Sequence, residues 1–340
     1  MPKTSISDLN IAVVGATGAV GTEFLSILTQ KYANLPKLKL LASKRSAGKQ
    51  LTIGNNKITV EETSTNSFAG IDIAFISVSS EISQMLAPYA VKSGAIVIDD
   101  SSAFRMESNV PLVVPEVNGN DCTWHEGIIS IPNCSTTPLV MVLKALSDLS
   151  EITRVTAATY QSVSGAGAAA MEALRTETQH IIDGSPSISE TDQIGFNVIP
   201  RIDDFLDNGY TKEEQKMIDE TKKILHMPQL AVSATCARVP VFISHSEAVH
   251  IEFKTKPNVS EIKTKLQSFP GITVMDNPSQ DSYPMPYDIE GEDDVYVGRI
   301  REDVSTQNGI VLWIVSDNLR KGASLNSIQI AETLVSLGLV

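Results

Sequence analysis

The stretch that most constrains the fold lies near the N-terminus, where a buried strand leads into a glycine-rich turn and then a helix. Residues 9–14, LNIAVV, are apolar and largely β-branched, which is typical of a strand covered on both faces. The turn GATGAVG follows at once, and TEFLSILTQKY then has helical periodicity. A strand, a tight turn and a helix in this order begin a βαβ unit, so an α/β fold with a mostly parallel sheet is expected.

The glycine turn also predicts a ligand. Three glycines spaced three residues apart let backbone N–H groups approach a pyrophosphate at the N-terminus of the following helix. A glycine triplet alone could be only a tight turn, but its position between strand and helix favours dinucleotide binding. The residues expected to contact the dinucleotide here are Gly15, Thr17, Gly18, Ala19 and Val20.

The second predicted strand, residues 37–43, indicates which dinucleotide binds. An NAD-binding domain commonly places an acidic residue near this strand end, where it accepts a hydrogen bond from the ribose 2′-hydroxyl. Here the strand ends in Ser43-Lys44-Arg45-Ser46. Hydroxyls and cations suit a 2′-phosphate, which a carboxylate would repel. The sequence therefore favours NADP over NAD, with Ser43, Arg45 and Ser46 as contacts.

Further segments predict a two-domain organisation. Strands over 72–78, 95–100 and 127–131 and a helix over 80–94 extend the parallel sheet. A second region has the pattern of a mixed or antiparallel sheet. Its expected strands are 152–163, 231–241, 248–255 and 295–301, and its expected helices are 166–182 and 211–225. Residues 309–319 are expected to form a further buried strand that leads into the C-terminal helix. The segment 183–193 is expected to be a loop. We expect a Rossmann-like NADP-binding domain over 1–133 and 317–340, completed by a returning C-terminal helix, and an α+β catalytic and dimerisation domain over 134–316.

Composition excludes several classes of protein. The formal net charge is −13, which argues against nucleic acid or an anionic membrane as partner. The N-terminus lacks the apolar core of a signal peptide, and no run of 18 apolar residues exists to span a membrane. Three cysteines cannot all pair, and their spacing does not suggest a metal site. We expect a cytoplasmic protein without a bound metal, in which free thiols persist.

One of the cysteines occupies a chemically suggestive position. Cys134, in SIPNCSTTPLV, lies between a short predicted strand and a predicted helix, for which Ser135, Thr136 and Thr137 are candidate N-caps. A helix N-terminus stabilises a thiolate, so Cys134 could be a nucleophile. A free cysteine is more often simply a small buried side chain. From the local pattern alone, both interpretations remain open.

An ordered set of motifs spans nearly the whole chain. They are VVGATGAVG, LASKRSAGK, DDSSAFRM, IPNCSTTP, YQSVSGAG, SATCARVPV, SHSE and DNLRKGA. From about Asn10 to the C-terminal helix, the chain resembles the bacterial-type aspartate-β-semialdehyde dehydrogenases. The resemblance implies reversible conversion of aspartyl-β-phosphate and NADPH into aspartate semialdehyde, NADP and phosphate. It implies a step toward lysine, methionine and threonine, and a homodimer or homotetramer.

The resemblance also implies a mechanism and the residues that carry it. A thiolate attacks the acyl phosphate, phosphate leaves, and the thioester accepts a hydride from the nicotinamide. Cys134 occupies the family's nucleophile position, His245 its acid/base position and Gln161 its active-site glutamine, while Asn133 would help position the acyl group. Cys122 and Cys236 keep the interpretation of buried structural residues.

The same resemblance assigns the charged groups of the substrate site. Arg105 and Lys216 match cations that bind phosphate, and Arg238 matches the arginine that clamps the α-carboxylate, for which a planar guanidinium is suited. Glu213, one helical turn before Lys216, would assist substrate recognition. Further cofactor contacts are implied at Ser164, Gly165 and Asn318.

Three alternative functions stay open at this stage. N-acetyl-glutamyl-phosphate reductase uses the same thioester chemistry on a longer substrate with a blocked amine. A cysteine hydrolase built from Cys134, His245 and Asn133 would leave the glycine turn without a purpose. A non-catalytic NADP-binding sensor would leave the thiol, the imidazole and the anion-binding residues unexplained.

Overall fold

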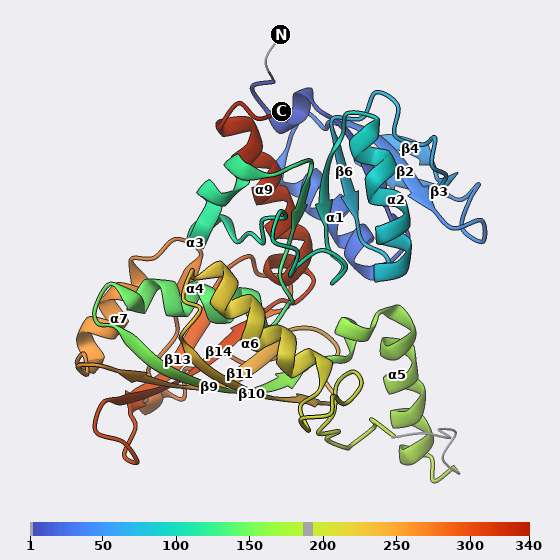
Figure 1. Ribbon diagram of the computed structural model, residues 1–340. Coiled ribbons are helices and arrows are strands. Elements are labelled where there is room, and N and C mark those ends of the chain that lie inside the picture. Colours follow the sequence, from blue (N-terminus) through green and yellow to red (C-terminus); the bar gives the residue numbers. More distant parts are fainter. Residues whose placement is uncertain (1–2, 186–192) are drawn as a thin grey trace. The chain divides into compact units, whose positions relative to one another are not determined.

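The computed structural model describes residues 3–185 and 193–340, and the chain divides into two compact units (Figure 1). The first unit consists of Met1–Pro132 and Ala323–Val340, and the second of Asn133–Gly322. Most of the loop expected over 183–193 lies outside the described residues.

The first unit is built on a six-stranded sheet in the order β5-β2-β1-β6-β7-β8, in which all neighbours pair in parallel. The strands are β1 (Asn10–Val14), β2 (Lys37–Ala42), β5 (Glu61–Glu62), β6 (Ile73–Ile76), β7 (Ile96–Asp99) and β8 (Ile128–Ser130). A separate hairpin, β3 (Gln50–Ile53) and β4 (Asn56–Thr59), follows β2. The helices are α1 (Ala19–Lys31), α2 (Ser80–Lys92), α3 (Pro115–Asn118) and α9 (Leu325–Ser336).

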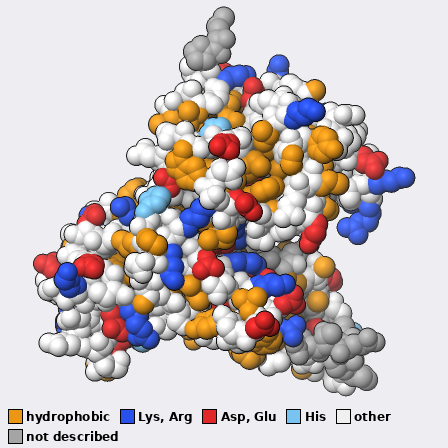
Figure 2. Space-filling view, in the orientation of Figure 1, with side chains coloured by type: hydrophobic (Ala, Val, Ile, Leu, Met, Phe, Trp, Pro, Cys, Tyr) orange, Lys and Arg blue, Asp and Glu red, His pale blue; other side chains and the backbone are white. Residues whose placement is uncertain are grey.

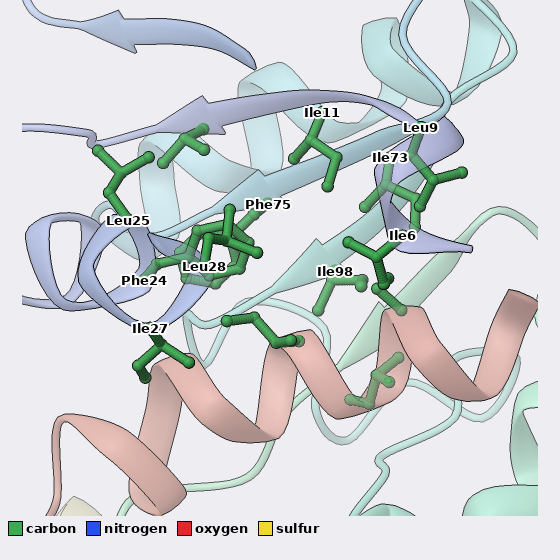
Figure 3. Close-up of a cluster of buried hydrophobic side chains, with 14 of the residues drawn as sticks. Ile6, Leu9, Ile11, Phe24, Leu25, Ile27, Leu28, Ile73, Phe75 and Ile98 are labelled. Atoms are coloured by element: carbon green, nitrogen blue, oxygen red, sulfur yellow. The ribbon is translucent and has the colours of Figure 1, made fainter. Parts of the chain in front are cut away.

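Helices cover both faces of this parallel sheet. On one face, Phe24 and Leu28 of α1 and Ile328 of α9 join a core with strand residues such as Phe75 (Figure 3). The rings of Phe24 and Phe75 are stacked, with centroids 4.4 Å apart. On the other face, Leu86, Ala87 and Ala90 of α2 contribute to a second cluster of buried side chains. The continuous apolar strand sequences follow from this burial on both faces.

The order of strands determines where a ligand can approach. β1 pairs with β2 on one side and with β6 on the other, so the connections leave β1 in opposite directions across the sheet. Ligands of open α/β sheets bind beyond the carboxyl ends of the strands at such a switch point. The glycine turn lies there because it directly follows β1.

The second unit contains a mixed six-stranded sheet in the order β10-β9-β11-β14-β13-β12. The outer pairs β10–β9 and β12–β13 are parallel, and the pairs between them are antiparallel. The strands are β9 (Ile152–Gln161), β10 (Ala231–Arg238), β11 (His245–Phe253), β12 (Ile272–Val274), β13 (Val295–Glu302) and β14 (Gly309–Ser316). The helices are α4 (Thr136–Ser147), α5 (Ala168–Ile182), α6 (Lys212–Ile224), α7 (Val259–Gln267) and α8 (Pro286–Ile289).

Short helical turns complete the chain. They are η1 (Ile6–Asp8), η2 (Gly119–Trp124), η3 (Val163–Ala166), η4 (Pro278–Gln280) and η5 (Arg320–Ser324). Of these, η1, η3 and η4 are short 3₁₀ helices, η2 is a longer one and η5 is a π-helix. The π-helix directly precedes α9.

Strand register in the second unit places functional side chains in a row. Arg238 of β10 lies opposite Gln161 of β9, and His245 of β11 lies opposite Ser316 of β14. Because Ser246 pairs with Tyr160, His245 and Gln161 share the same level across β9 and β11. Facing residues in adjacent strands share a face of the sheet, so these four side chains form one row. We call Arg238, Gln161, His245 and Ser316 the active row.

The predicted fold class is confirmed, including the C-terminal helix packed on the first unit, where Asn326 Nδ2 donates to Val113 O at 2.9 Å. The expected strands occur with ends that differ by a few residues. The largest differences are three residues: β11 begins at His245 rather than at 248, β10 ends at Arg238 rather than at 241, and β14 ends at Ser316 rather than at 319. The hairpin β3–β4, the edge strands β5 and β12, and the helices α7 and α8 were not expected from the sequence.

The boundaries between the units have clear physical causes. Asn133 belongs to the second unit because its backbone N–H donates to Glu220 and its amide to Glu213. Asp317 and Asn318 also belong there, since Asp317 accepts the Gly291 N–H and Asn318 accepts hydrogen bonds from serines of that unit. The structure therefore divides the chain between residues 132 and 133 and between 322 and 323, whereas the sequence predicts domain boundaries at 133/134 and 316/317.

The surface carries charges of both signs. Acidic and basic side chains are interspersed over the face that Figure 2 shows, although the whole chain has a formal net charge of −13. Within residues 3–185 and 193–340, no helix is long and apolar enough to cross a membrane.

Candidate active site

Cys134 lies immediately before α4, in a turn that Asn133 organises. The Asn133 side-chain oxygen accepts the N–H of Ser135 at 2.9 Å, and its carbonyl oxygen accepts the N–H of Thr137 at 3.1 Å. Ser135 occupies the N-cap position, but its side chain makes no capping hydrogen bond. The expected capping by the serine and threonine hydroxyls is thus replaced by capping from Asn133. Cys134 nevertheless lies at the N-terminal end of α4, where the helix dipole favours a negative charge.

The Cys134 sulfur lies 3.3 Å from Nε2 of His245, the first residue of β11. His245 is held from its other ring nitrogen by Ser162, which follows β9. The Ser162 backbone N–H donates to His245 Nδ1 at 3.0 Å, and the Ser162 hydroxyl lies 3.0 Å from the same atom. The thiol and the imidazole that the sequence predicted as partners are therefore in direct contact.

The hydrogen bonds at His245 assign its proton. A backbone N–H can only donate, so Nδ1 must present a lone pair to Ser162. The proton of the neutral ring then resides on Nε2, facing the sulfur. Burial, and secondly the nearby charge of Arg238, lower the pKa of His245 to about 3. His245 is consequently a neutral ring that offers an N–H to Cys134.

Glu213 of α6 gathers three predicted substrate residues. Its Oε1 accepts from the Asn133 amide at 2.8 Å and from the Gln161 amide at 3.4 Å. Its Oε2 lies 3.2 Å from Nζ of Lys216, which also pairs with Asp203 at 2.9 Å. Burial opposes the charge on Lys216, but these two carboxylates raise its pKa. Glu213 and Lys216 thus form an i,i+3 ion pair, and the Glu213 carboxylate also contacts Asn133 in the turn that carries Cys134.

The helix carrying Glu213 is fixed by its own capping box. The Thr211 hydroxyl accepts the Glu214 N–H, and the Glu214 carboxylate accepts the Thr211 N–H at 2.7 Å. Glu214 Oε1 also accepts the N–H of Cys236 in β10 at 3.0 Å. Glu214 thus anchors α6 to the sheet, whereas the Glu213 carboxylate makes its contacts within the candidate site.

Arg238 is the cation of the active row. Burial lowers its pKa, and the neighbouring Cys134 and Glu213 partly oppose that shift. Its Nη1 donates to Ser162 O at 2.7 Å. Gly165 packs against this group: a Cβ there would lie 3.1 Å from Arg238 Nη1 and 3.2 Å from His245 Nε2. The lack of a side chain at Gly165 lets the arginine and the histidine lie together.

Asn318 joins the end of the second unit to the active row. Its side-chain oxygen accepts from the hydroxyls of Ser162 at 3.1 Å and Ser164 at 3.0 Å, and from the Ser244 N–H at 3.0 Å. Four residues on, a Cβ at Gly322 would lie 3.0 Å from Cβ of Cys134. The DNLRKGA motif, remote in sequence, therefore contributes directly to the thiol site.

Six of the residues predicted to bind the dinucleotide line one cavity of the first unit, whereas Ala19 and Val20 do not line it. It measures about 360 Å³ and contains Gly15, Thr17, Gly18, Ser43 and Ser46, together with both basic residues between the serines. Gly15 has φ +87°, and a Cβ there would lie 2.2 Å from Ser77 O. The first helical hydrogen bond of α1 runs from Thr22 N to Gly18 O, so the N–H groups of Ala19 and Val20 precede the helical ladder.

This cavity fits a dinucleotide by its chemistry. The lack of a side chain at Gly15 lets the turn after β1 pack against Ser77 at the edge of the cavity, and the start of α1 supplies N–H donors for a pyrophosphate. Two hydroxyls and two cations gather at the carboxyl end of β2, where the adenosine ribose of a dinucleotide belongs. Arg105, by contrast, lies after β7 in the first unit and donates from Nη2 to Asp100 O at 2.9 Å.

Several site residues escaped the sequence analysis. Ser162, which orients His245, and Glu220, whose carboxylate accepts the Asn133 N–H at 2.7 Å, were not singled out. Nor were Gly322 and Glu62, which lines the dinucleotide cavity. Ser162 stands within the quoted YQSVSGAG motif and Gly322 within DNLRKGA, and these motifs were the available signals. The other contacts depend on tertiary packing between distant segments.

The other two cysteines behave as expected for structural residues. Cys122 and Cys236 are fully buried, and burial raises the pKa of both thiols. Among the described residues, no group of three or more His, Cys, Asp and Glu side chains is arranged to hold a metal ion.

A dinucleotide-type domain joined to a mixed-sheet domain bearing a thiol–imidazole pair defines a class of acyl-reducing oxidoreductases. Two family models match the chain: the NAD binding domain of semialdehyde dehydrogenase over residues 10–125 and its dimerisation domain over residues 143–321. The chain belongs to the aspartate-semialdehyde dehydrogenase family.

Individual relatives agree along almost the full length. The chain is 52% identical to aspartate-semialdehyde dehydrogenase of Bacillus subtilis, covering 98% of this chain and 99% of the relative. The crystal structure of aspartate semialdehyde dehydrogenase II from Vibrio cholerae, complexed with ASA, superposes with a TM-score of 0.94 at 42% identity, over 97% and 98% of the two chains. The Candida albicans enzyme, solved with NADP, matches with a TM-score of 0.78 at 28% identity, over 98% and 100%.

Proposed function

We propose that this chain reversibly reduces L-aspartyl-β-phosphate with NADPH to L-aspartate-β-semialdehyde and phosphate, through a thioester on Cys134. The product would serve lysine, methionine and threonine synthesis. The observation that carries the proposal is the 3.3 Å approach of the Cys134 sulfur to His245 Nε2, at the start of a helix and beside Arg238 and Glu213. Membership of the family supports the aspartyl substrate.

Cys134 is proposed to attack as a thiolate. Three features favour the negative charge: the N-terminus of α4, the His245 Nε2–H, and the Arg238 guanidinium. Attack on the acyl carbon forms the carbon–sulfur bond and breaks the bond to phosphate, which leaves. When bound, the nicotinamide cofactor supplies the hydride for the reductive half of the reaction.

His245, which occupies the family's acid/base position, is proposed to act as a proton donor toward the sulfur, with the proton of its neutral ring on Nε2. Removing the thiol proton with Nε2 as base would require the other tautomer, which would forfeit the Ser162 N–H hydrogen bond. With the proton on Nε2, the ring stabilises sulfur charge twice: as thiolate before attack and as the leaving sulfur when the tetrahedral hemithioacetal collapses. Ionisation of the Cys134 thiol is then favoured by the charge of Arg238 and by the N-terminus of α4.

The substrate's charges match the surrounding side chains. Arg238 is proposed to clamp the α-carboxylate, and Glu213 to face the α-ammonium. Gln161 and Asn133, both hydrogen-bonded to Glu213, would orient the acyl group. Lys216 and Arg105 are proposed to bind the phosphate.

The cofactor is proposed to be NADP. Gly15, Thr17, Gly18, Ala19 and Val20 would hold the pyrophosphate, and Ser43, Arg45 and Ser46 the 2′-phosphate, because hydroxyls and a cation suit a dianion. Further contacts are proposed at Ser164, Gly165 and Asn318. We assign cofactor binding to 1–133 and 317–340, and catalysis and dimerisation to 134–316.

The assembly is proposed to be a homodimer or homotetramer, supported by the match to a dimerisation domain. A cytoplasmic location is proposed because the mechanism needs a reduced thiol at Cys134, and reducing compartments keep thiols free.

The proposal is tested by following NADP reduction with aspartate semialdehyde in the presence and absence of phosphate or arsenate. We expect NADPH to accumulate only with the anion, and kcat/KM to exceed that for N-acetyl-glutamate semialdehyde by well over a hundredfold. The blocked amine leaves Glu213 without its ammonium, and the extra methylene moves the carbonyl away from the sulfur. Comparable rates with both aldehydes would overturn the substrate assignment and favour the N-acetyl-glutamyl alternative.

A substitution separates the substrate's recognition from its chemistry. Glu213→Ala should reduce the preference for the free amine, since it removes the carboxylate that faces the ammonium. Lack of phosphate-dependent reduction with either aldehyde would instead point to a cysteine hydrolase or a cofactor-binding sensor.

A further inference from the structure

The dinucleotide cavity of the first unit contains an acid that the sequence analysis did not anticipate. Glu62 lines this cavity with Ser43, Lys44, Arg45 and Ser46. In sequence it lies well beyond this basic segment, after the β3–β4 hairpin. The cavity therefore places a carboxylate where the serines and cations were expected to select for a 2′-phosphate.

The position of Glu62 is set by strand pairing. Strand β5 pairs in parallel with the end of β2, with Glu61 opposite Leu41 and Glu62 opposite Ala42. The next residue locks this register, because the Thr63 N–H and hydroxyl both donate to Ala42 O, at 2.9 and 3.0 Å. Glu62 is thus held beside the last residue of β2.

Adjacent acids on β5 have different surroundings. Successive side chains of a strand point to opposite faces. Glu61 forms an ion pair with Lys39, with Nζ and Oε2 3.4 Å apart, and it does not line the cavity. Glu62, one residue on, does. The chain therefore provides a matched pair of neighbouring glutamates, of which only one faces the nucleotide cavity.

The chemistry of this position is specific. A carboxylate at the carboxyl end of the second strand accepts a hydrogen bond from the ribose 2′-hydroxyl of NAD. The same carboxylate repels a 2′-phosphate, which Arg45 and Lys44 attract. Here β5 supplies the acid, and the cations follow β2. One cavity therefore contains a group suited to a 2′-hydroxyl and groups suited to a 2′-phosphate.

We propose that Glu62 is a specificity-determining residue that reads the ribose 2′-hydroxyl and lowers the preference of this site for NADP over NAD. The proposal rests on the dinucleotide assignment made above. The balance between Arg45 and Glu62, rather than Arg45 alone, sets the ratio of the two affinities.

The experiment measures the binding of NADPH and NADH to the full chain by nucleotide fluorescence, without substrate. Glu62→Gln keeps the shape of the side chain and removes its charge. NADPH should bind about three- to tenfold more tightly, and NADH about three- to tenfold more weakly because a charge-assisted acceptor is lost. A higher salt concentration should reduce this gain in NADPH affinity. Dissolved ions screen the repulsion between the 2′-phosphate and the Glu62 carboxylate, which is partly exposed to solvent.

Glu61→Gln is the matched control and should leave the NADPH to NADH affinity ratio within about twofold of wild type, because this residue faces Lys39. A Glu62→Gln ratio equal to that of the control would overturn the proposal. Arg45→Ala separates this failure from failure of the site itself. If Arg45→Ala weakens NADPH alone, the dinucleotide assignment stands without a role for Glu62. If Arg45→Ala and Glu62→Gln both leave the two affinities unchanged, the dinucleotide assignment fails as well.

Discussion

At the scale of single residues, the proposed chemistry depends on how His245 is held. Its Nδ1 accepts a backbone N–H from Ser162, and its Nε2 faces the sulfur of Cys134. The burial that lowers its pKa to about 3 also removes competing water. An imidazole in this setting carries one proton on a defined atom throughout the neutral pH range, which matches the need for a donor beside a thiolate.

His245→Asn tests this role. We expect kcat to fall by about two to four decades, since the proton on Nε2 is lost while the surrounding hydrogen bonds can partly persist. Binding of aspartate semialdehyde should change much less, because Arg238 and Glu213 remain. Steady-state kinetics with phosphate would show a loss mainly in kcat. An unchanged kcat would move the proton-handling role to another group.

How well the site could be predicted depended on how far apart its residues lie in the sequence. Cys134 and His245 stood in local motifs that carry a family resemblance, and their pairing was expected. Gly322 and Glu62 could not be assigned, because each acts through packing against a segment far away in the chain. The role expected for Ser135 as a side-chain cap was wrong, because the Thr137 N–H that it would accept is bound to the Asn133 backbone oxygen and Pro138 has no N–H.

At the scale of elements, the face of the second unit's sheet that α4 and α6 cover carries successive rows of polar side chains. The row next to the active row contains Cys236, Thr159 and Glu247, in register across β10, β9 and β11. Glu247 is fully buried, and neither carboxyl oxygen has a hydrogen-bond partner among the described residues. Burial raises its pKa well above the ordinary value. Burial therefore favours the protonated, neutral form of Glu247, two residues from His245.

A neutral buried acid makes stability depend on pH. Unfolding exposes Glu247, which then ionises above its ordinary pKa of 4.5, whereas the folded chain keeps the proton. The unfolded state binds fewer protons in this window, so this group lowers stability as pH rises from about 4.5 toward the folded pKa. Relative to wild type, Glu247→Gln should gain Tm progressively as pH rises from 5 to 8, measured by calorimetry. A Tm difference that is independent of pH would show that Glu247 is ionised in the folded protein.

The elements themselves divide into those that sequence can and cannot predict. Long apolar runs such as β1 and β14 and the capped helix α6 were expected, because burial and capping leave strong local patterns. The short polar strand β5, of which both residues are acidic, has no such pattern. It forms only because β2 offers a free sheet edge to pair with, and that is a tertiary property.

At the scale of the whole molecule, the second unit presents an apolar surface on the opposite side of its sheet from the active row. Tyr160 lies next to Trp313, with ring centroids 5.4 Å apart, and both Tyr160 and Met285 are partly exposed. A hollow of about 280 Å³ lies beside them, lined by Trp313, Met285 and the arginines at 299 and 301. We expect this surface to bind a second copy of the chain, because this unit matches a dimerisation domain.

Tyr160→Lys tests the expected interface. The introduced lysine would lie beside Arg299 and Arg301 without an acidic partner, and association would remove water from its charge. The protein should therefore shift from dimer toward monomer at micromolar concentration. Val304→Lys, at a fully exposed loop position, is the control and should leave the mass unchanged. Multi-angle light scattering distinguishes the two species. An unaltered dimer in Tyr160→Lys would place the interface elsewhere.

The central claim is that Cys134 carries the acyl group. The direct measurement is mass spectrometry of the protein after incubation with aspartate semialdehyde and NADP in the absence of phosphate. We predict an aspartyl adduct on the peptide containing Cys134, released when phosphate is added. The adduct should be retained in Cys236→Ala and absent from Cys134→Ala, which should still bind NADP. An adduct that persists in Cys134→Ala, or NADPH formation by that variant at a substantial rate, would contradict the thioester mechanism.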